Sequence, residues 1–202
     1  MLFKIKKFLL PALIAISKHL DYETFTNKVY ATFQQFNLDD IWGVRKVCIE
    51  NLANLIKYLK PSEITKIQEC VEFFKRCLGD SNRWVKNQSL IQFGPIVHQI
   101  YLKKNEIENS KDENKEDLKR QISEIVDKMC LIFYDLKLIN TAPEGDLEDS
   151  LMEKLDEYSF MQNGKTEDVD KIKYYWAYNM PCAILVNGGQ KFWVSHLKNV
   201  YD

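Results

Sequence analysis

Apolar residues recur at spacings of three and four along most of the chain, which is typical of amphipathic helices packed on a core. This pattern predicts helices over about residues 23–37, 40–59, 62–78, 82–102, 118–138 and 168–186, a weak helix near 147–155, and a further helix starting at 191. Glycine and proline are sparse, at 7 and 5 of 202 residues, which favours helices over turn-rich β structure.

One segment breaks the periodicity. Twelve of the eighteen residues from 103 to 120 are charged, six of each sign, which predicts a solvated loop that extends a helix at either end. Residues 140–149 are predicted to form a second loop.

The sequence also matches itself when it is shifted by 41 residues. Residues 39–45 (DDIWGVR) fall over 80–86 (DSNRWVK), and apolar residues pair onward in step, such as Leu52 with Phe93. Each copy therefore contains two helices joined by a tight turn, and repeated units of this size are typical of stacked helical hairpins.

Prolines give a second mark of register. Pro11, Pro95 and Pro181 are 84 and 86 residues apart, close to two periods, and each lies in an apolar stretch. A proline inside a helix removes a hydrogen bond and bends the helix. We therefore assign the apolar run 8–16 to the second helix of a preceding, incomplete pair. Its expected core positions are Leu9, Leu13 and Ile16.

Together these patterns predict one all-α domain over residues 1–202, an α–α superhelix of about three and a half helical hairpins. The expected repeats are 1–20 (partial), 21–60, 61–103, 118–187 (with insertions) and 190–202 (partial). The last segment carries an apolar stripe that either meets further chain or packs back on its neighbour. The stripe comprises Phe192, Trp193, Leu197 and Val200.

The turn between the helices of each copy carries charged residues at a fixed spacing. Asp39 and Arg45 are six residues apart, as are Asp80 and Lys86. An aspartate at this place caps the helix that follows. The cation one or two turns later reaches the aspartate of the neighbouring copy, which gives a ladder of charge-assisted hydrogen bonds. We assign these four residues a structural role.

Two tryptophans lie in or beside the same turns. Trp42 and Trp84 either form a ridge for a partner, since tryptophan is favoured at binding hot spots, or pack between adjacent copies. The sequence leaves both interpretations open. Arg83 has no structural duty that the pattern identifies, so it is the best single candidate for a partner contact.

Charge and candidate chemistry narrow the function classes. The chain has 28 basic and 29 acidic residues, whereas a nucleic-acid binder usually has a basic excess. The five cysteines match no metal motif, and we expect reduced core thiols. The three histidines are scattered, and no phosphate-binding loop or hydrolase motif is present. We expect no catalytic residue, no metal and no cofactor.

The N-terminus shows part of the pattern of a targeting segment. Lys4, Lys6 and Lys7 precede an apolar run in the manner of a signal peptide, but Pro11 interrupts the run and Lys18 follows it. The run is also too short to span a membrane. We therefore expect a cytoplasmic or nuclear protein, or one found in both compartments, with no membrane partner.

Three blocks carry a resemblance to a known family. They are residues 40–48 (DIWGVRKVC), 83–86 (RWVK) followed by 93–95 (FGP), and 178–185 (YNMPCAIL) followed by Gly188, Gly189 and Trp193. In order and approximate spacing they resemble the HEAT-repeat family, and within it the group of regulatory subunit 1 of protein phosphatase 4. The proteins of that group are much longer than this chain.

The resemblance implies a non-catalytic scaffold that binds a serine/threonine phosphatase catalytic subunit and directs it to substrates. It also implies that partners bind along the turns within the repeats, at Asp40, Trp42, Arg83 and Trp84. Two alternatives stay open: a HEAT-repeat adaptor of another pathway, and a HEAT-like DNA glycosylase. A glycosylase would show a continuous basic groove with a tryptophan and a carboxylate at its floor, whereas a scaffold would show a neutral or mixed ridge.

Overall fold

A computed structural model of the chain describes residues 3–109, 114–141 and 190–198, and the regular structure in these ranges is entirely helical. The prediction of an all-α chain is confirmed for this part. The elements are α1 (Phe3–Ile16), η1 (Ser17–His19), α2 (Tyr22–Thr24), η2 (Phe25–Tyr30), α3 (Ala31–Phe36), α4 (Trp42–Tyr58), α5 (Ile64–Leu78), α6 (Arg83–Glu108), α7 (Lys115–Thr141), α10 (Gln190–Phe192) and η3 (Trp193–Leu197). The predictions for residues 142–189, which include the helix at 168–186, Pro181 and Cys182, lie outside the described residues.

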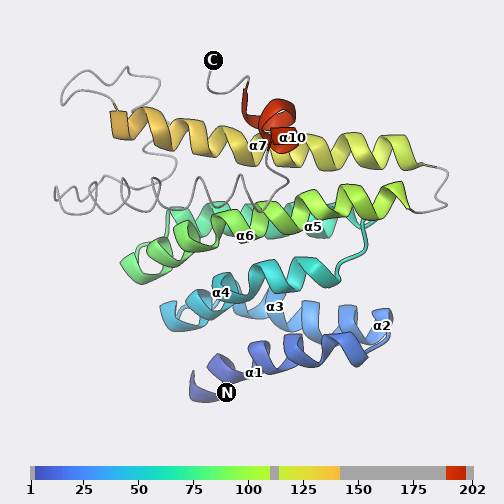
Figure 1. Cartoon of the computed structure of the whole chain (residues 1–202). Coiled ribbons are helices and arrows are strands. Elements are labelled where there is room, and N and C mark those ends of the chain that lie inside the picture. Colours follow the sequence, from blue (N-terminus) through green and yellow to red (C-terminus); the bar gives the residue numbers. More distant parts are fainter. Residues whose placement is uncertain (1–2, 110–113, 142–189, 199–202) are drawn as a thin grey trace.

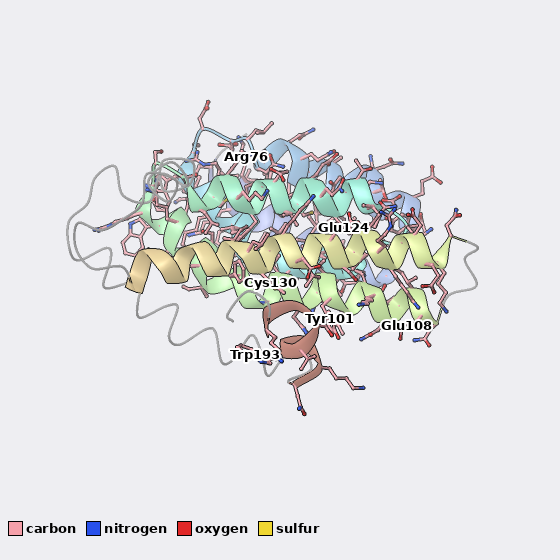
Figure 2. The ribbon with its side chains drawn as sticks, turned by 90° about the horizontal axis from the view of Figure 1, so that it is seen from above. Arg76, Tyr101, Glu108, Glu124, Cys130 and Trp193 are labelled. Carbon is pink, nitrogen blue, oxygen red and sulfur yellow. The ribbon has the colours of Figure 1, made fainter. Side chains whose placement is uncertain are left out.

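The helices form two layers. α1, α4 and α6 pack side by side in one layer, while the segment α2–η2–α3 and helix α5 form the other. Successive pairs therefore lie one above another, from α1 at one end to α7 at the other (Figure 1). Seen along the stack, α7 lies over the line between α5 and α6 (Figure 2).

The core follows the three-and-four spacing of the sequence. In α5, Ile67, Cys70, Phe74 and Cys77 are buried on the face that meets α4 and α6. Burying an aromatic or aliphatic side chain of this size stabilises the fold by about 1.5–3 kcal/mol. Gly79 ends α5, and its N–H donates to carbonyls of the last turn. Asn82 begins α6 by accepting a hydrogen bond from the Trp84 N–H.

A π turn interrupts the first helix of the first complete pair. The helical segment that begins at Tyr22 changes to π geometry over Phe25–Tyr30 and returns to α geometry at Ala31. Phe25, Val29 and Tyr30 are all buried within this turn. π turns inside α-helices hold an extra residue, and here the extra residue leaves both halves of the segment facing the core.

The register that we assigned to the N-terminal run is wrong by one residue. Leu10 and Ile14 are the buried positions of α1, while Ile16 is 48% exposed. The assigned Leu9 and Leu13 are only partly buried and pack at the edge of the core. Among the described helices, α1 has a neighbour of its own layer on one side only, so a periodicity taken from a helix with two neighbours misplaces its core face. The predicted positions of Pro11 and Pro95 inside helices are confirmed.

The charged segment extends a helix at either end, as predicted. α6 continues to Glu108 and α7 begins at Lys115, so helices enter the segment from both ends. Arg120 shows why, since it pairs with Asp117 and Glu124 along one helix face. Pairs at spacings of three and four stabilise exposed helices modestly.

Lys103 is buried, although we placed it in the solvated loop. Its side chain is 2% exposed, and Nζ donates to the carbonyl of Lys57 at 2.8 Å and to Glu106 at 2.9 Å. Burial lowers the pKa of Lys103, and the hydrogen bond to Glu106 opposes this shift. Lys57 belongs to the last turn of α4, whose carbonyls lack helical partners, so Lys103 caps that helix from a neighbouring one.

The cysteine prediction is confirmed where it is described. Cys48, Cys70, Cys77 and Cys130 are buried and unpaired by disulfides. Burial raises the pKa of each thiol, to about 12 for Cys130.

In the C-terminal segment, Trp193 packs against the core, and η3 contacts α7. Of the two alternatives left open for the last stripe, Trp193 therefore follows the one in which the segment packs back on its neighbour, while the side chains of Phe192, Leu197 and Val200 lie outside the described residues.

Candidate partner-binding edge

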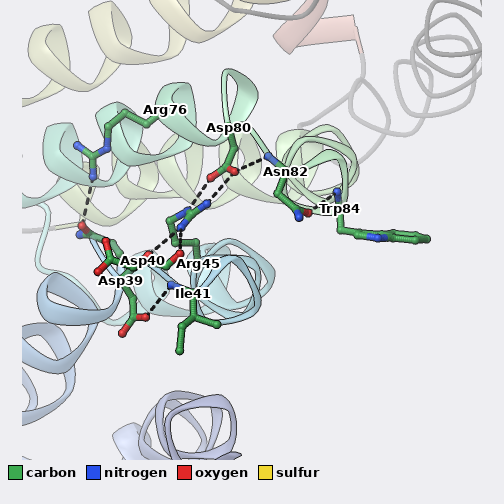
Figure 3. A network of polar contacts seen from close by, with 9 residues as sticks. Asp39, Asp40, Ile41, Arg45, Arg76, Asp80, Asn82 and Trp84 are labelled. Carbon is green, nitrogen blue, oxygen red and sulfur yellow. Dashed lines mark hydrogen bonds and ion pairs between the residues drawn. The ribbon is translucent and has the colours of Figure 1, made fainter. Parts of the chain in front are cut away.

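The turns of the two complete pairs lie next to each other, and one arginine joins them. Arg45 Nε lies 2.7 Å from Asp80 Oδ2, and Nη2 lies 2.9 Å from Asp80 Oδ1 (Figure 3). Nη1 donates to the carbonyls of Asp39 at 2.8 Å and Asp40 at 3.0 Å. The guanidinium therefore binds groups of both turns, in the fork geometry that makes such pairs strong.

Between α1 and the first turn, a lysine takes the place of the arginine. Lys6 of α1 forms an ion pair with Asp39, so each of these aspartates meets a cation from the helix pair before it. Lys6 was not among the predicted residues, because the 84-residue spacing of Pro11 and Pro95 places Leu2 opposite Lys86, the counterpart of Arg45. Burial alone raises the pKa of Asp39, but the hydrogen bonds from Lys6 and the Ile41 N–H hold the pKa below its ordinary value.

The predicted capping role of the two aspartates is wrong in detail. Asp39 Oδ1 accepts from the N–H of Ile41 at 3.0 Å, and Asp80 Oδ1 accepts from the N–H of Asn82 at 2.8 Å. Ile41 and Asn82 are themselves the residues that precede the helices. Each aspartate therefore bonds two residues ahead and shapes the turn, an arrangement typical of aspartate in turns.

Lys86 is the remaining member of the predicted ladder. It is half-buried in the first turns of α6, and its carbonyl accepts from the Ser89 hydroxyl at 2.7 Å. The next aspartate of such a ladder would belong to the turn after α7, which lies outside the described residues.

An open groove with a volume of about 380 Å³ lies between the two turns. It combines three carboxylates with two guanidiniums, so its polarity is mixed. Arg76 at its rim donates to Asn37 Oδ1 at 3.2 Å and links α5 to the first turn. Neither residue was predicted, since nothing in the repeat pattern marks them. The lining residues are Asn37, Leu38, Asp39, Asp40, Arg45, Phe73, Arg76, Cys77, Asp80 and Ser81.

The predicted contact residues flank this groove. Trp42 is the first residue of α4 and is 43% exposed, and Trp84 is the second residue of α6 and is 49% exposed. Arg83 is exposed, and its Cζ lies 5.0 Å from the centroid of the Trp84 ring. In Figure 3 the Trp84 ring points away from the charged cluster. The structure therefore brings Asp40, Trp42, Arg83 and Trp84 to one edge, with both rings half in solvent.

Further apolar surface belongs to the same edge. Leu38 is 70% exposed and lines the groove, and Ile41 is 40% exposed immediately before Trp42. Exposed apolar residues with charged neighbours are typical of protein–protein contact surfaces. The repeat pattern did not single out either residue.

The described residues include no group of three or more His, Cys, Asp or Glu side chains placed to hold a metal ion. None of the described helices combines the length and the apolar character needed to cross a membrane. No family model matches the chain, and no curated protein or solved structure is significantly similar to it.

Proposed function

We propose that this protein is a non-catalytic scaffold, built as a HEAT-type superhelix, that binds a partner protein along its turn edge. The single observation that carries the proposal is the half-exposure of Trp42 and Trp84 beside an open groove of mixed charge. Tryptophan and arginine are the residues most often found at the centres of binding surfaces.

The rigidity of the edge supports the proposal. Arg45 fixes the first turn to the second through four hydrogen bonds, so the two tryptophans are presented by turns of constrained spacing. A surface that is ordered before binding loses less conformational freedom when a partner binds.

The mixed charge of the groove favours a protein partner over DNA. A glycosylase is expected to show a continuous basic groove, whereas Asp39, Asp40 and Asp80 offset the two arginines here. The partner that we propose is the catalytic subunit of a phosphatase 4-type serine/threonine phosphatase, directed by this scaffold to its substrates in the cytoplasm or nucleus. The support for that choice is the resemblance of the three sequence blocks.

The test measures binding of the purified full chain to a purified phosphatase 4-type catalytic subunit by calorimetry. We expect Arg83→Glu to weaken binding at least tenfold with an unchanged melting temperature. Arg120→Glu is the matched control, because Arg120 is an exposed arginine on α7 with only local ion pairs. If the unaltered chain does not bind this subunit, the phosphatase assignment is wrong. Loss of folding in Arg83→Glu would instead make Arg83 structural.

A further inference from the structure

Helix α1 lies at the opposite end of the stack from α7 (Figure 1), and it carries a second exposed apolar surface. Phe8 is 71% exposed, Ile5 is 50% exposed and Ile16 is 48% exposed. Together with exposed Ala12 they follow steps of three and four, which place them on one stripe of the helix. We call these four residues the α1 stripe. No residue of the α1 stripe lines the turn groove.

The other side of α1 is apolar as well. Leu10 and Ile14 are buried, and α1 packs on α4. A helix that is apolar on opposite sides is normally covered on both. α4 is in the same layer and has a helix on each side, namely α1 and α6. A helix placed on the α1 stripe would continue the side-by-side packing of that layer.

The charges around the α1 stripe specify the kind of helix. α1 and η1 contain Lys4, Lys6, Lys7, Lys18 and His19 and no acidic residue. Lys6 pairs with Asp39, but Lys4 and Lys7 are exposed and have no ion-pair partner among the described residues. At 100° per residue, Lys4 and Lys7 lie on the same flank of the stripe. An apolar stripe with one basic flank is complementary to an amphipathic helix with an acidic flank.

A second copy of the chain fits this surface poorly. Antiparallel pairing of two α1 helices brings Lys4 and Lys7 of one copy toward Lys18 and His19 of the other. Like charges at that contact are unfavourable.

We propose that the α1 stripe binds an acidic amphipathic helix of a partner protein, as a contact separate from the turn edge. Phe8 inserts its ring between apolar residues of the bound helix, and Lys4 and Lys7 pair with its flanking carboxylates. The bound helix takes the place beside α1 that α1 itself takes beside α4.

The test uses the purified full chain and a labelled synthetic peptide about five turns long, with leucines along one face and glutamates on both flanks. Fluorescence anisotropy is expected to show binding that weakens with added salt. A peptide with lysines in place of the glutamates, and one with the leucines scattered, should bind at least tenfold more weakly. Phe8→Ser and Lys4→Glu/Lys7→Glu should each reduce binding of the acidic peptide at least tenfold.

The control is Ile91→Ser on α6, an exposed apolar residue away from α1, which should leave peptide binding unchanged. Equal binding of the acidic and basic peptides, or no binding, overturns the proposal. So does a dimer that Phe8→Ser dissociates, seen by light scattering. Binding to vesicles that contain phosphatidylserine, in place of the acidic peptide, would assign the stripe to a lipid surface instead. The double lysine variant tests the charge component even if Phe8→Ser is unstable.

Discussion

Arg45 and Asp80 are 35 residues apart in sequence, yet their side chains form a two-pronged ion pair between α4 and the turn before α6. The two nitrogen–oxygen distances are 2.7 and 2.9 Å, and the side chains are 19% and 8% exposed. The hydrogen bonds to Asp80 raise the pKa of the Arg45 guanidinium. Because the same guanidinium also binds two carbonyls of the preceding turn, this single side chain fixes the spacing between successive turns.

Replacing Arg45 should therefore destabilise the fold more than a surface ion pair would. We expect Arg45→Met to lower the free energy of unfolding by about 2–4 kcal/mol, because it leaves a mostly buried carboxylate without its partner. Arg45→Lys should recover only part of the loss, since an ammonium cannot form the fork. Urea unfolding measures both. Lys75→Met, which removes an exposed pair with Glu72, should cost under about 0.5 kcal/mol. Equal effects at the two sites would contradict the structural role of Arg45.

Lys103 provides a second test, because its ammonium is buried at the end of a neighbouring helix. We expect Lys103→Met to destabilise the fold by about 1–3 kcal/mol, since the Lys57 carbonyl loses its donor while the packing of the alkyl chain is kept. The adjacent Lys104, which is only half-buried, is the matched control. The free energies of unfolding of both variants are measured in denaturant. If Lys104→Met lowers this free energy more than Lys103→Met does, the α4 cap contributes nothing.

The buried thiols predict how stability responds to alkaline pH. The folded-state pKa of Cys70 is raised by burial, whereas an unfolded thiol titrates near its ordinary value of about 8.5. Above that pH the unfolded chain loses protons that the native chain keeps, so this contribution to stability is complete below pH 8.5 and falls as the pH rises. Above pH 8.5, ionisation of each such thiol in the unfolded chain lowers the free energy of unfolding by up to about 1.4 kcal/mol per pH unit.

The measurement is the free energy of unfolding in urea, with reductant, between about pH 8.5 and 10. Cys70→Ala should show a shallower decline than the unaltered chain, whatever its absolute stability. Identical slopes would mean that the Cys70 thiol ionises equally in both states.

Tyr30 joins the first helix of one pair to the first helix of the next. Its hydroxyl donates to Glu69 at 2.5 Å and lies 3.4 Å from the Lys66 carbonyl, while its ring packs beside Phe33. Tyr30→Phe should cost about 1–2 kcal/mol, because the ring is retained and only the hydrogen bonds are lost. Tyr58→Phe is the control, since no described group bonds to the Tyr58 hydroxyl, and its thermal shift should be negligible.

Sequence periodicity located the helices well because burial imposes a spacing of three and four on every packed helix. The 41-residue shift also brought Asp39 and Asp80 into equivalent turns, where the structure places them against Lys6 and Arg45. It missed Lys6 because α1 lies at the end of the stack and departs from the register of the other helices.

Burial of a charged side chain is harder to infer. Lys103 stands at the start of a segment in which most residues are charged, and a linear pattern cannot distinguish the lysine that points inward from those that face water. Only the position of α4 beside α6 identifies it, through the Lys57 carbonyl. Arg76 and Asn37 were missed for a similar reason, since their contact joins two copies and has no counterpart at the repeat spacing.

The π turn over Phe25–Tyr30 predicts which single-residue deletions the chain tolerates. Phe25 and Val29 are four residues apart, whereas their counterparts Ile67 and Cys70 in α5 are three apart, and all four are buried. Deleting exposed Asn27 should convert the π turn into regular α-helix and keep both core contacts. Deleting exposed Gln68 should rotate one half of α5 by about 100° and turn its buried residues toward water. The segment α2–η2–α3 is therefore expected to tolerate the loss of one residue, whereas α5 is not.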